Sequence, residues 1–185
     1  MAKTEEAHYS VLSKDGDIET RLYAGDLLAQ VEVVGERKEA LNKGFRLLAD
    51  YIFGNNTVRK NIEMTAPVMQ EISQKIPMTA PVMQESSGSK WIVSFVMPAH
   101  FTLQTLPQPN NTKIQIVQRK PQKYLAIRFS GFSSGSNFEQ HTEILETYIK
   151  KNNIRVLGNP IWAQYNPPWT LPFWRRNEVL FKLEN

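Results

Sequence analysis

Few residues of this chain have side chains that commonly ligate metals or act as nucleophiles. Its 185 residues include three histidines, His8, His100 and His141, and no cysteine. Without cysteine, the sequence excludes disulfides, thiolate nucleophiles and cysteine-ligated metals. His8 lies in the N-terminal stretch, His100 follows Pro98 in an expected loop, and His141 falls on an expected helix. Each is more readily explained as a structural or exposed residue than as a ligand.

Catalytic motifs are also missing from the sequence. It contains no HExxH, no glycine-rich phosphate loop and no nucleophile–base pair at a known spacing. Tyr165, Glu178 and the histidines could support proton transfer only if the fold brings them together. No catalytic residue is therefore predicted, and binding is favoured over turnover.

Two segments carry more apolar side chains than their expected positions need. Residues 36–53 predict a helix whose core stripe includes Leu41, Leu48 and Ile52. A second apolar line, roughly 100° further round this helix, consists of Phe45, Ala49 and Phe53. The loop at 166–176, NPPWTLPFWRR, is dense in proline and aromatic residues. Burial of the helix on two sides would explain the second line, and so would a groove that this line floors.

A near-repeat occupies residues 62–85, where IEMTAPVMQE is followed by IPMTAPVMQE. Alternation places Ile76, Met78 and Ala80 on one face of a strand, and the first copy is patterned alike. We expect the two copies to form a hairpin in which Met64 and Met78 are packing residues, with breaks at Pro67 and Pro81, which cannot donate to a ladder.

The remaining elements repeat in order along the chain. Strands are expected at 91–98, 113–119 and 123–131, a second helix at 136–152 capped by Ser136 or Asn137, and closing strands around NPIWAQY and NEVLFKLE. This order predicts an α+β fold: a distorted antiparallel β-barrel of two pseudo-symmetric halves with two α-helices. We expect a flexible arm at 1–17, with a turn at 14–16, and one domain at 18–185, with halves of about 18–88 and 89–185.

Several motifs resemble those of one family. KNIEMTAPVMQE, WIVSFVMPAHFTLQTLPQPNN, AIRFSG and PIWAQYNPPWTLPFWRRNEVLF occur in this order and are similar to segments of the SOUL family of haem-binding proteins. The resemblance extends from about Ile18 to Phe181. It implies the fold described above and a shallow apolar groove between the first helix and the loop before the last strand.

Transferred to this sequence, the resemblance implies a tetrapyrrole site at that groove. The residues expected to contact haem or an iron-free porphyrin are Phe45, Arg46, Ala49, Phe53, Trp169, Leu171, Phe173, Trp174 and Arg175. Lys43 and Arg176 are further candidates for the propionates. Axial ligation is the weakest part of this expectation: His100 and His141 are the candidate ligands, but neither is expected on the groove, so haem could bind without a protein ligand to its iron or with a remote one.

Composition limits the other classes of function. The net charge of +4 comes without a long basic run, so no nucleic-acid partner is expected. The N-terminus has no apolar signal region and no apolar run reaches about 20 residues, which favours a soluble cytoplasmic protein. A carrier, buffer or sensor of haem is the favoured function. An enzyme acting on the tetrapyrrole, for instance by removing iron, and a small-molecule effector-binding module are the alternatives.

Overall fold

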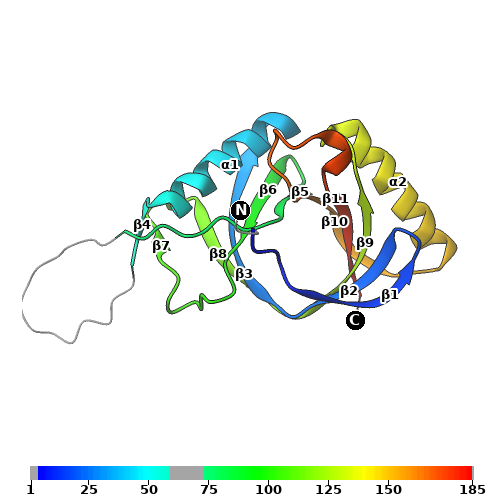
Figure 1. Ribbon diagram of the computed structural model, residues 1–185, viewed down its shortest axis with the longest axis horizontal. Helices are drawn as coiled ribbons and strands as arrows, with labels where there is room; N and C mark the ends of the chain where they lie inside the picture. The colour runs from blue at the N-terminus through cyan, green and yellow to red at the C-terminus, as the bar shows by residue number, and fades with distance from the viewer. Residues whose placement is uncertain (1–3, 59–72, 185) are drawn as a thin grey trace, which may run out of the picture.

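A computed structural model describes residues 4–58 and 73–184. A curled antiparallel sheet of nine strands forms a half-barrel, and two α-helices lie on its outer side (Figure 1). The predicted α+β class is confirmed. The elements are β1 (Tyr9–Asp15), β2 (Ile18–Tyr23), β3 (Asp26–Val34), α1 (Arg37–Phe53), β4 (Asn56–Thr57), β5 (Val82–Ser87), β6 (Lys90–Val96), β7 (Gln108–Pro109), β8 (Ile114–Arg119), β9 (Gln122–Phe129), α2 (Gly135–Lys151), β10 (Val156–Gln164), the 3-10 helix η1 (Pro172–Trp174) and β11 (Asn177–Leu183).

The strand order contains a topological repeat. The sheet runs β1-β2-β9-β11-β10-β5-β6-β3-β8, and β4 pairs with β7 separately. One lobe, β5-β6-β3-β8, lies under α1, and the other, β10-β11-β9-β2, lies under α2. The sequence of each repeat is strand, strand, helix, strand, strand. The first strand of each repeat pairs with a strand of the other repeat: β2 pairs with β9, and β8 pairs with β3. We call β2 and β8 the exchanged strands.

The expected boundary between the halves falls within one hairpin. β5 and β6 pair across Gly88, which has a φ of 62°, a conformation that glycine adopts without strain. The repeats defined by topology therefore run from β2 to β6 and from β8 to β11.

Helix α1 forms where the 3.6-residue pattern predicts it. Its sheet-facing side includes Leu48, Tyr51 and Ile52, each at most 1% exposed, and burial of such side chains contributes about 1.5–3 kcal/mol each. Gly54 ends the helix with a φ of 133° and donates its N–H to the carbonyls of the last turn.

Helix α2 begins earlier than predicted. Ser134 is the N-cap, and its hydroxyl accepts a hydrogen bond from the Asn137 N–H at 3.3 Å. The predicted caps, Ser136 and Asn137, were wrong because both already lie inside the first turn. Phe138 and Leu145, both 0% exposed, anchor this helix on its lobe.

Part of the predicted N-terminal arm lies in the sheet. Residues 9–15 form β1, which pairs with β2 through a turn at 16–17, close to the predicted turn. Before β1, the chain runs beside residues 76–85, the second copy of the sequence near-repeat. There the Ala7 N–H donates to the Ala80 carbonyl at 3.0 Å.

The predicted hairpin of the two near-repeats is wrong for the second copy. β5 begins only at Val82, and its two neighbours are β6 and β10. Pro77 and Pro81 have no N–H, so the ladder cannot extend back through 76–81. As a result the alternation fails: Ile76 and Thr79 are buried whereas Met78, expected to be a packing residue, is 37% exposed. The first copy, with Met64, lies outside the described residues.

Candidate functional site

One row of residues crosses the sheet between the two helices. Phe95 of β6 pairs with Val82 of β5, Val82 with Gln164 of β10, and Gln164 with Asn177 of β11. Directly paired residues point to the same face, and Phe95 belongs to the core under α1, so this is the outer face. Val82 and Gln164 are only half-buried. Neither helix therefore covers this part of the sheet completely.

The α1 side of this gap is apolar. The Phe45 ring lies over β6, 5.3 Å from the ring of Phe95, and it is 37% exposed. Ala49 is half-buried, and Phe53 is 63% exposed. Because β6 is the strand of this lobe that lies next to β5, this flank of α1 faces the half-buried row.

The loop 165–176 borders the other side. It leaves β10 at Gln164, two strand spacings or about 10 Å from Phe95. Its large apolar side chains are exposed, by 83% for Trp169, 47% for Leu171, 64% for Phe173 and 70% for Trp174. The arrangement is a strip of sheet between two exposed apolar surfaces.

The predicted cations differ in their environment. The Arg175 guanidinium donates to the carbonyls of Thr170 and Pro168 at 2.7 and 2.5 Å, so it holds the loop in shape. Arg176 is bound to Glu178 and Glu6. Arg46 and Lys43 instead line a shallow hollow on the outer side of α1, together with acidic residues.

Lys38 is a candidate that the sequence reasoning missed. It is exposed, and it precedes Phe45 by seven residues, which places both side chains on the same flank of α1. The i, i+7 spacing was available in the sequence.

Of the candidate axial ligands, His141 lies at the α2 end of this row, because the next residue of the row after Asn177 is Phe129, whereas His100 lies outside the row. The His141 ring stacks on Phe129 with centroids 3.8 Å apart, and its Nδ1 lies 2.8 Å from the Asn137 carbonyl oxygen. His100 is exposed, with its ring against Phe101. His141 thus packs under α2, and His100 lies in the loop that follows β6.

A charged cluster is buried inside the half-barrel. Glu178, 0% exposed, accepts hydrogen bonds from Arg21 at 2.7 and 3.0 Å, from Tyr165 at 2.8 Å and from Arg176 at 2.8 Å. Burial and the negative charge of Glu178 raise the pKa of Tyr165 well above its usual range. Burial alone would lower the pKa of Arg21, but its hydrogen bonds to Glu178 outweigh that effect and raise it.

The fold therefore does bring Tyr165 and Glu178 together, as proton transfer would require. A phenol with a raised pKa is a poor acid, and the oxygens of Glu178 already accept hydrogen bonds from two guanidinium groups. The cluster is suited to holding opposite charges in a buried place, and its geometry favours a structural role.

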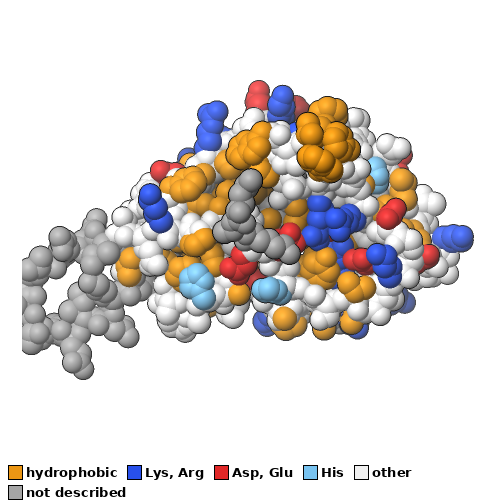
Figure 2. Space-filling view, viewed as in Figure 1, with side chains coloured by type: hydrophobic (Ala, Val, Ile, Leu, Met, Phe, Trp, Pro, Cys, Tyr) orange, Lys and Arg blue, Asp and Glu red, His pale blue; other side chains and the backbone are white. Residues whose placement is uncertain are grey.

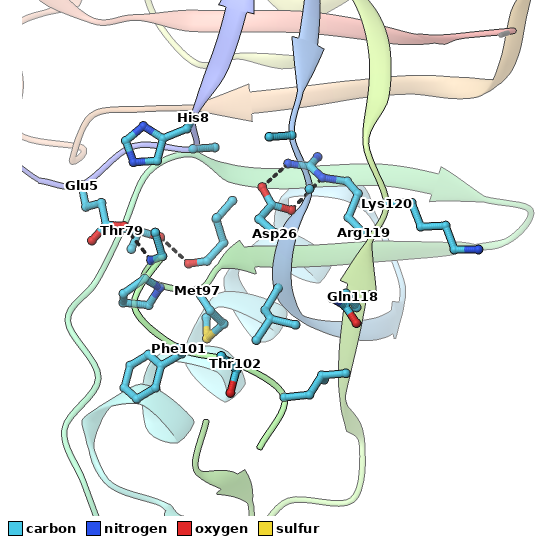
Figure 3. A pocket seen from close by; sticks show the side chains of 18 of the residues that line it. Glu5, His8, Asp26, Thr79, Met97, Phe101, Thr102, Gln118, Arg119 and Lys120 are labelled. Carbon is cyan, nitrogen blue, oxygen red and sulfur yellow. Dashed lines mark hydrogen bonds and ion pairs between the residues drawn. The ribbon is translucent and has the colours of Figure 1, made fainter. Parts of the chain in front are cut away.

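A cavity of about 680 Å³ lies between the N-terminal segment, the start of β3 and the ends of β6 and β8 (Figure 3). Its lining includes Met97 and Phe101. Asp26 and Arg119 form an ion pair in its wall, with Nε and Oδ1 2.8 Å apart. The Thr79 hydroxyl donates to the Val96 carbonyl beside it. The residues predicted for the groove lie elsewhere in the described structure.

Comparison with known proteins assigns the family. The sequence pattern of the SOUL heme-binding protein family matches residues 4–182. The chain belongs to this family. Haem and related tetrapyrroles are therefore its implied class of ligand, and the match begins within the stretch that the sequence had suggested to be an arm.

The SOUL fold is shared with solved structures of very different sequence. The C-terminal domain of EcmrR superposes with a TM-score of 0.65 at 7% identity, over 96% of this chain and 98% of that one. A hydrolase from Listeria innocua gives a TM-score of 0.56 at 8% identity, over 94% of both chains. At such identities the likeness concerns the fold alone. No curated protein matches the sequence.

Proposed function

We propose that the protein binds haem or a related tetrapyrrole in the groove between α1 and the loop 165–176, as a carrier, buffer or sensor. The observation that supports this most is the half-buried strip at Val82 and Gln164 between two exposed apolar surfaces. A flat apolar ring placed there would cover Phe45 on one side and the aromatic loop on the other. Burial of apolar area contributes about 25 cal/mol per Å² before association costs.

The cations available to the propionates lie on the α1 side of the groove, whereas cations on both sides were expected. Lys38 and Arg46 lie on or next to the apolar flank of α1, and we assign the propionate contacts to them. Arg175 remains in the site through its loop, whose shape it maintains by donating to two carbonyls. We assign no axial ligand to His141 or His100.

Titration of the protein with haem, followed by absorbance, tests this site. Phe45→Asp and Trp174→Ala should each weaken binding about tenfold or more, which is about 1.4 kcal/mol. Iron-free protoporphyrin should bind within about tenfold of haem, because apolar contact carries the affinity in this proposal. His100→Ala and His141→Ala should have little effect.

Phe101→Asp is the matched control, since Phe101 lines the cavity beside the N-terminal segment. If Phe101→Asp abolished binding while Phe45→Asp left it intact, the ligand would occupy that cavity instead. Loss of binding in one histidine variant alone would indicate a ligated site at that histidine.

A further inference from the structure

The loop 165–176 exposes more aromatic surface than the groove needs. Together with Phe132, which follows β9, it forms a single patch, and we call this set the aromatic patch: Phe132, Trp169, Leu171, Phe173 and Trp174. Phe132 is 66% exposed, and its ring lies 5.7 Å from the Arg175 guanidinium carbon. Figure 2 shows the largest apolar cluster of this view at the top, where Figure 1 places η1. A patch that projects outward in this way faces whatever lies beyond the protein surface.

Part of the backbone of this loop forms its hydrogen bonds within the loop. Pro167, Pro168 and Pro172 have no N–H to satisfy. The N–H groups of Thr170, Trp174 and Arg175 donate to carbonyls within the loop, and the Gly131 N–H donates to Pro172 at 2.9 Å. The Arg175 guanidinium donates to two further carbonyls of the loop, those of Thr170 and Pro168.

Internal backbone hydrogen bonds of this kind matter most where the surroundings offer no hydrogen-bonding groups. A loop in water, or against a protein partner, finds hydrogen-bonding groups outside itself. A loop that enters the apolar part of a lipid layer must satisfy its polar backbone groups internally. Trp and Phe are also the residues that anchor proteins at the boundary between lipid head groups and acyl chains.

The two segments that carry the patch contain basic residues and no acidic residue. Residues 128–138 and 165–176 contain no acidic residue and include Arg128, Arg175 and Arg176. Arg176 is engaged by Glu178 and Glu6, which leaves Arg128 and Arg175 as the cations of these segments. The whole chain carries a net charge of +4. A negatively charged surface would complement this side of the molecule.

We infer that the aromatic patch docks on the surface of a lipid bilayer that contains anionic lipids. Phe173, Trp174 and Trp169 enter the interfacial layer, and the arginines lie at the level of the head groups. This attachment is peripheral; none of the described helices is long and apolar enough to cross a bilayer. The inference does not require tetrapyrrole binding, although the same loop would then border both the ligand and the membrane.

Vesicle sedimentation tests the inference on the full chain without any tetrapyrrole. The vesicles contain equal amounts of phosphatidylcholine and phosphatidylserine, with pure phosphatidylcholine as a comparison. Phe173→Ser and Phe53→Ser form a matched pair, because the two side chains are 64% and 63% exposed. Phe173→Ser should reduce partitioning about fivefold or more, since it removes an inserted aromatic ring. Phe53→Ser should leave it unchanged.

Quenching of tryptophan fluorescence by brominated lipids gives a second readout, which Trp169→Ala and Trp174→Ala should each diminish. The inference is overturned if the wild-type protein stays in the supernatant, or if the two serine variants lose partitioning equally. It is also overturned if light scattering shows a dimer that Phe173→Ser dissociates, because a second copy would then cover the patch. In haem titrations both serine variants should bind weakly, so failure of the membrane inference is distinguishable from failure of the groove.

Discussion

Glu178 is the residue on which the inner side of the half-barrel depends most. It is fully buried and accepts bonds from Arg21, which is 1% exposed, and from Tyr165 and Arg176. A buried pair of opposite charges contributes little net stability, but removing one partner leaves the other charge uncompensated in a place without water. The cluster therefore acts as a constraint on how β2, β10 and β11 can be arranged.

Glu178→Gln should lower the free energy of unfolding by about 3–5 kcal/mol, because Arg21 would lose its fully buried partner and keep only its ion pair with Glu19, whose side chain is 16% exposed. Urea unfolding followed by circular dichroism measures this. Glu32→Gln is the matched control: the Glu32–Lys90 pair has side chains that are 52% and 48% exposed, and its loss should cost at most about 1 kcal/mol. Equal costs for the two variants would show that the buried cluster does not constrain the fold.

Sequence reasoning reached the exposed aromatic residues but not this cluster. Phe45, Trp169 and Trp174 can be identified locally, because they are apolar at positions where a helix flank or a loop does not need apolar residues. Arg21 and Glu178 are separated by 157 residues, and nothing in their local sequence links them. The role of Arg175 was equally inaccessible, since its carbonyl partners depend on how the loop folds.

At the scale of elements, the contact between α1 and β6 is unusually close. A Cβ at Gly44 would lie 2.6 Å from the Val93 side chain, so glycine is needed there to let the helix approach the sheet. This approach brings Phe45, the next residue, over Phe95. The spacing between α1 and β6 thus sets how far the Phe45 ring stands above the sheet.

Gly44→Ala should destabilise the protein by about 1–3 kcal/mol through overpacking, although alanine is favoured by about 1 kcal/mol in a helix interior. Val93→Gly removes both the Cβ and the methyl carbons that a Cβ at Gly44 would meet, so in the double variant the overpacking cost of Gly44→Ala should largely disappear. A double-mutant cycle of unfolding free energies measures the coupling. Additive effects would show that α1 shifts freely over β6.

The elements themselves were largely predictable, and the exceptions have physical causes. Both helices and the strands from β6 to β11, apart from the short β7, follow local periodicity and turn residues. The second near-repeat looked like a strand from its alternation, but its prolines interrupt the ladder before Val82. The strand β1 was missed because its side chains are mostly exposed, so apolar alternation gave no signal.

At the scale of the whole molecule, the two repeats are joined by exchanged strands. Residues before the turn at 110–113 supply β2, which pairs with β9, and residues after it supply β8, which pairs with β3. A third strand pair between the two repeats joins β5 to β10 near the centre of the sheet. We call these three strand pairs, β2–β9, β3–β8 and β5–β10, the seams of the sheet. Local patterns predict two similar halves, but they do not specify which strand pairs across the molecule, because that choice is made by contacts distant in sequence.

The exchange predicts how the chain behaves when it is cut. Fragments 1–112 and 113–185 each lack partners along three seams of the sheet, so each should show no cooperative unfolding transition alone. Mixed in equal amounts, they should associate and regain the circular dichroism spectrum of the intact chain, because the cut falls in a turn and removes no strand. Urea titration of each fragment and of the mixture measures this, with size-exclusion chromatography to detect the complex. A fragment that unfolds cooperatively on its own would show that one lobe is stable without the strand it receives from the other. The exchanged strands would then link two lobes that fold independently, and neither lobe would need the strand supplied by the other repeat.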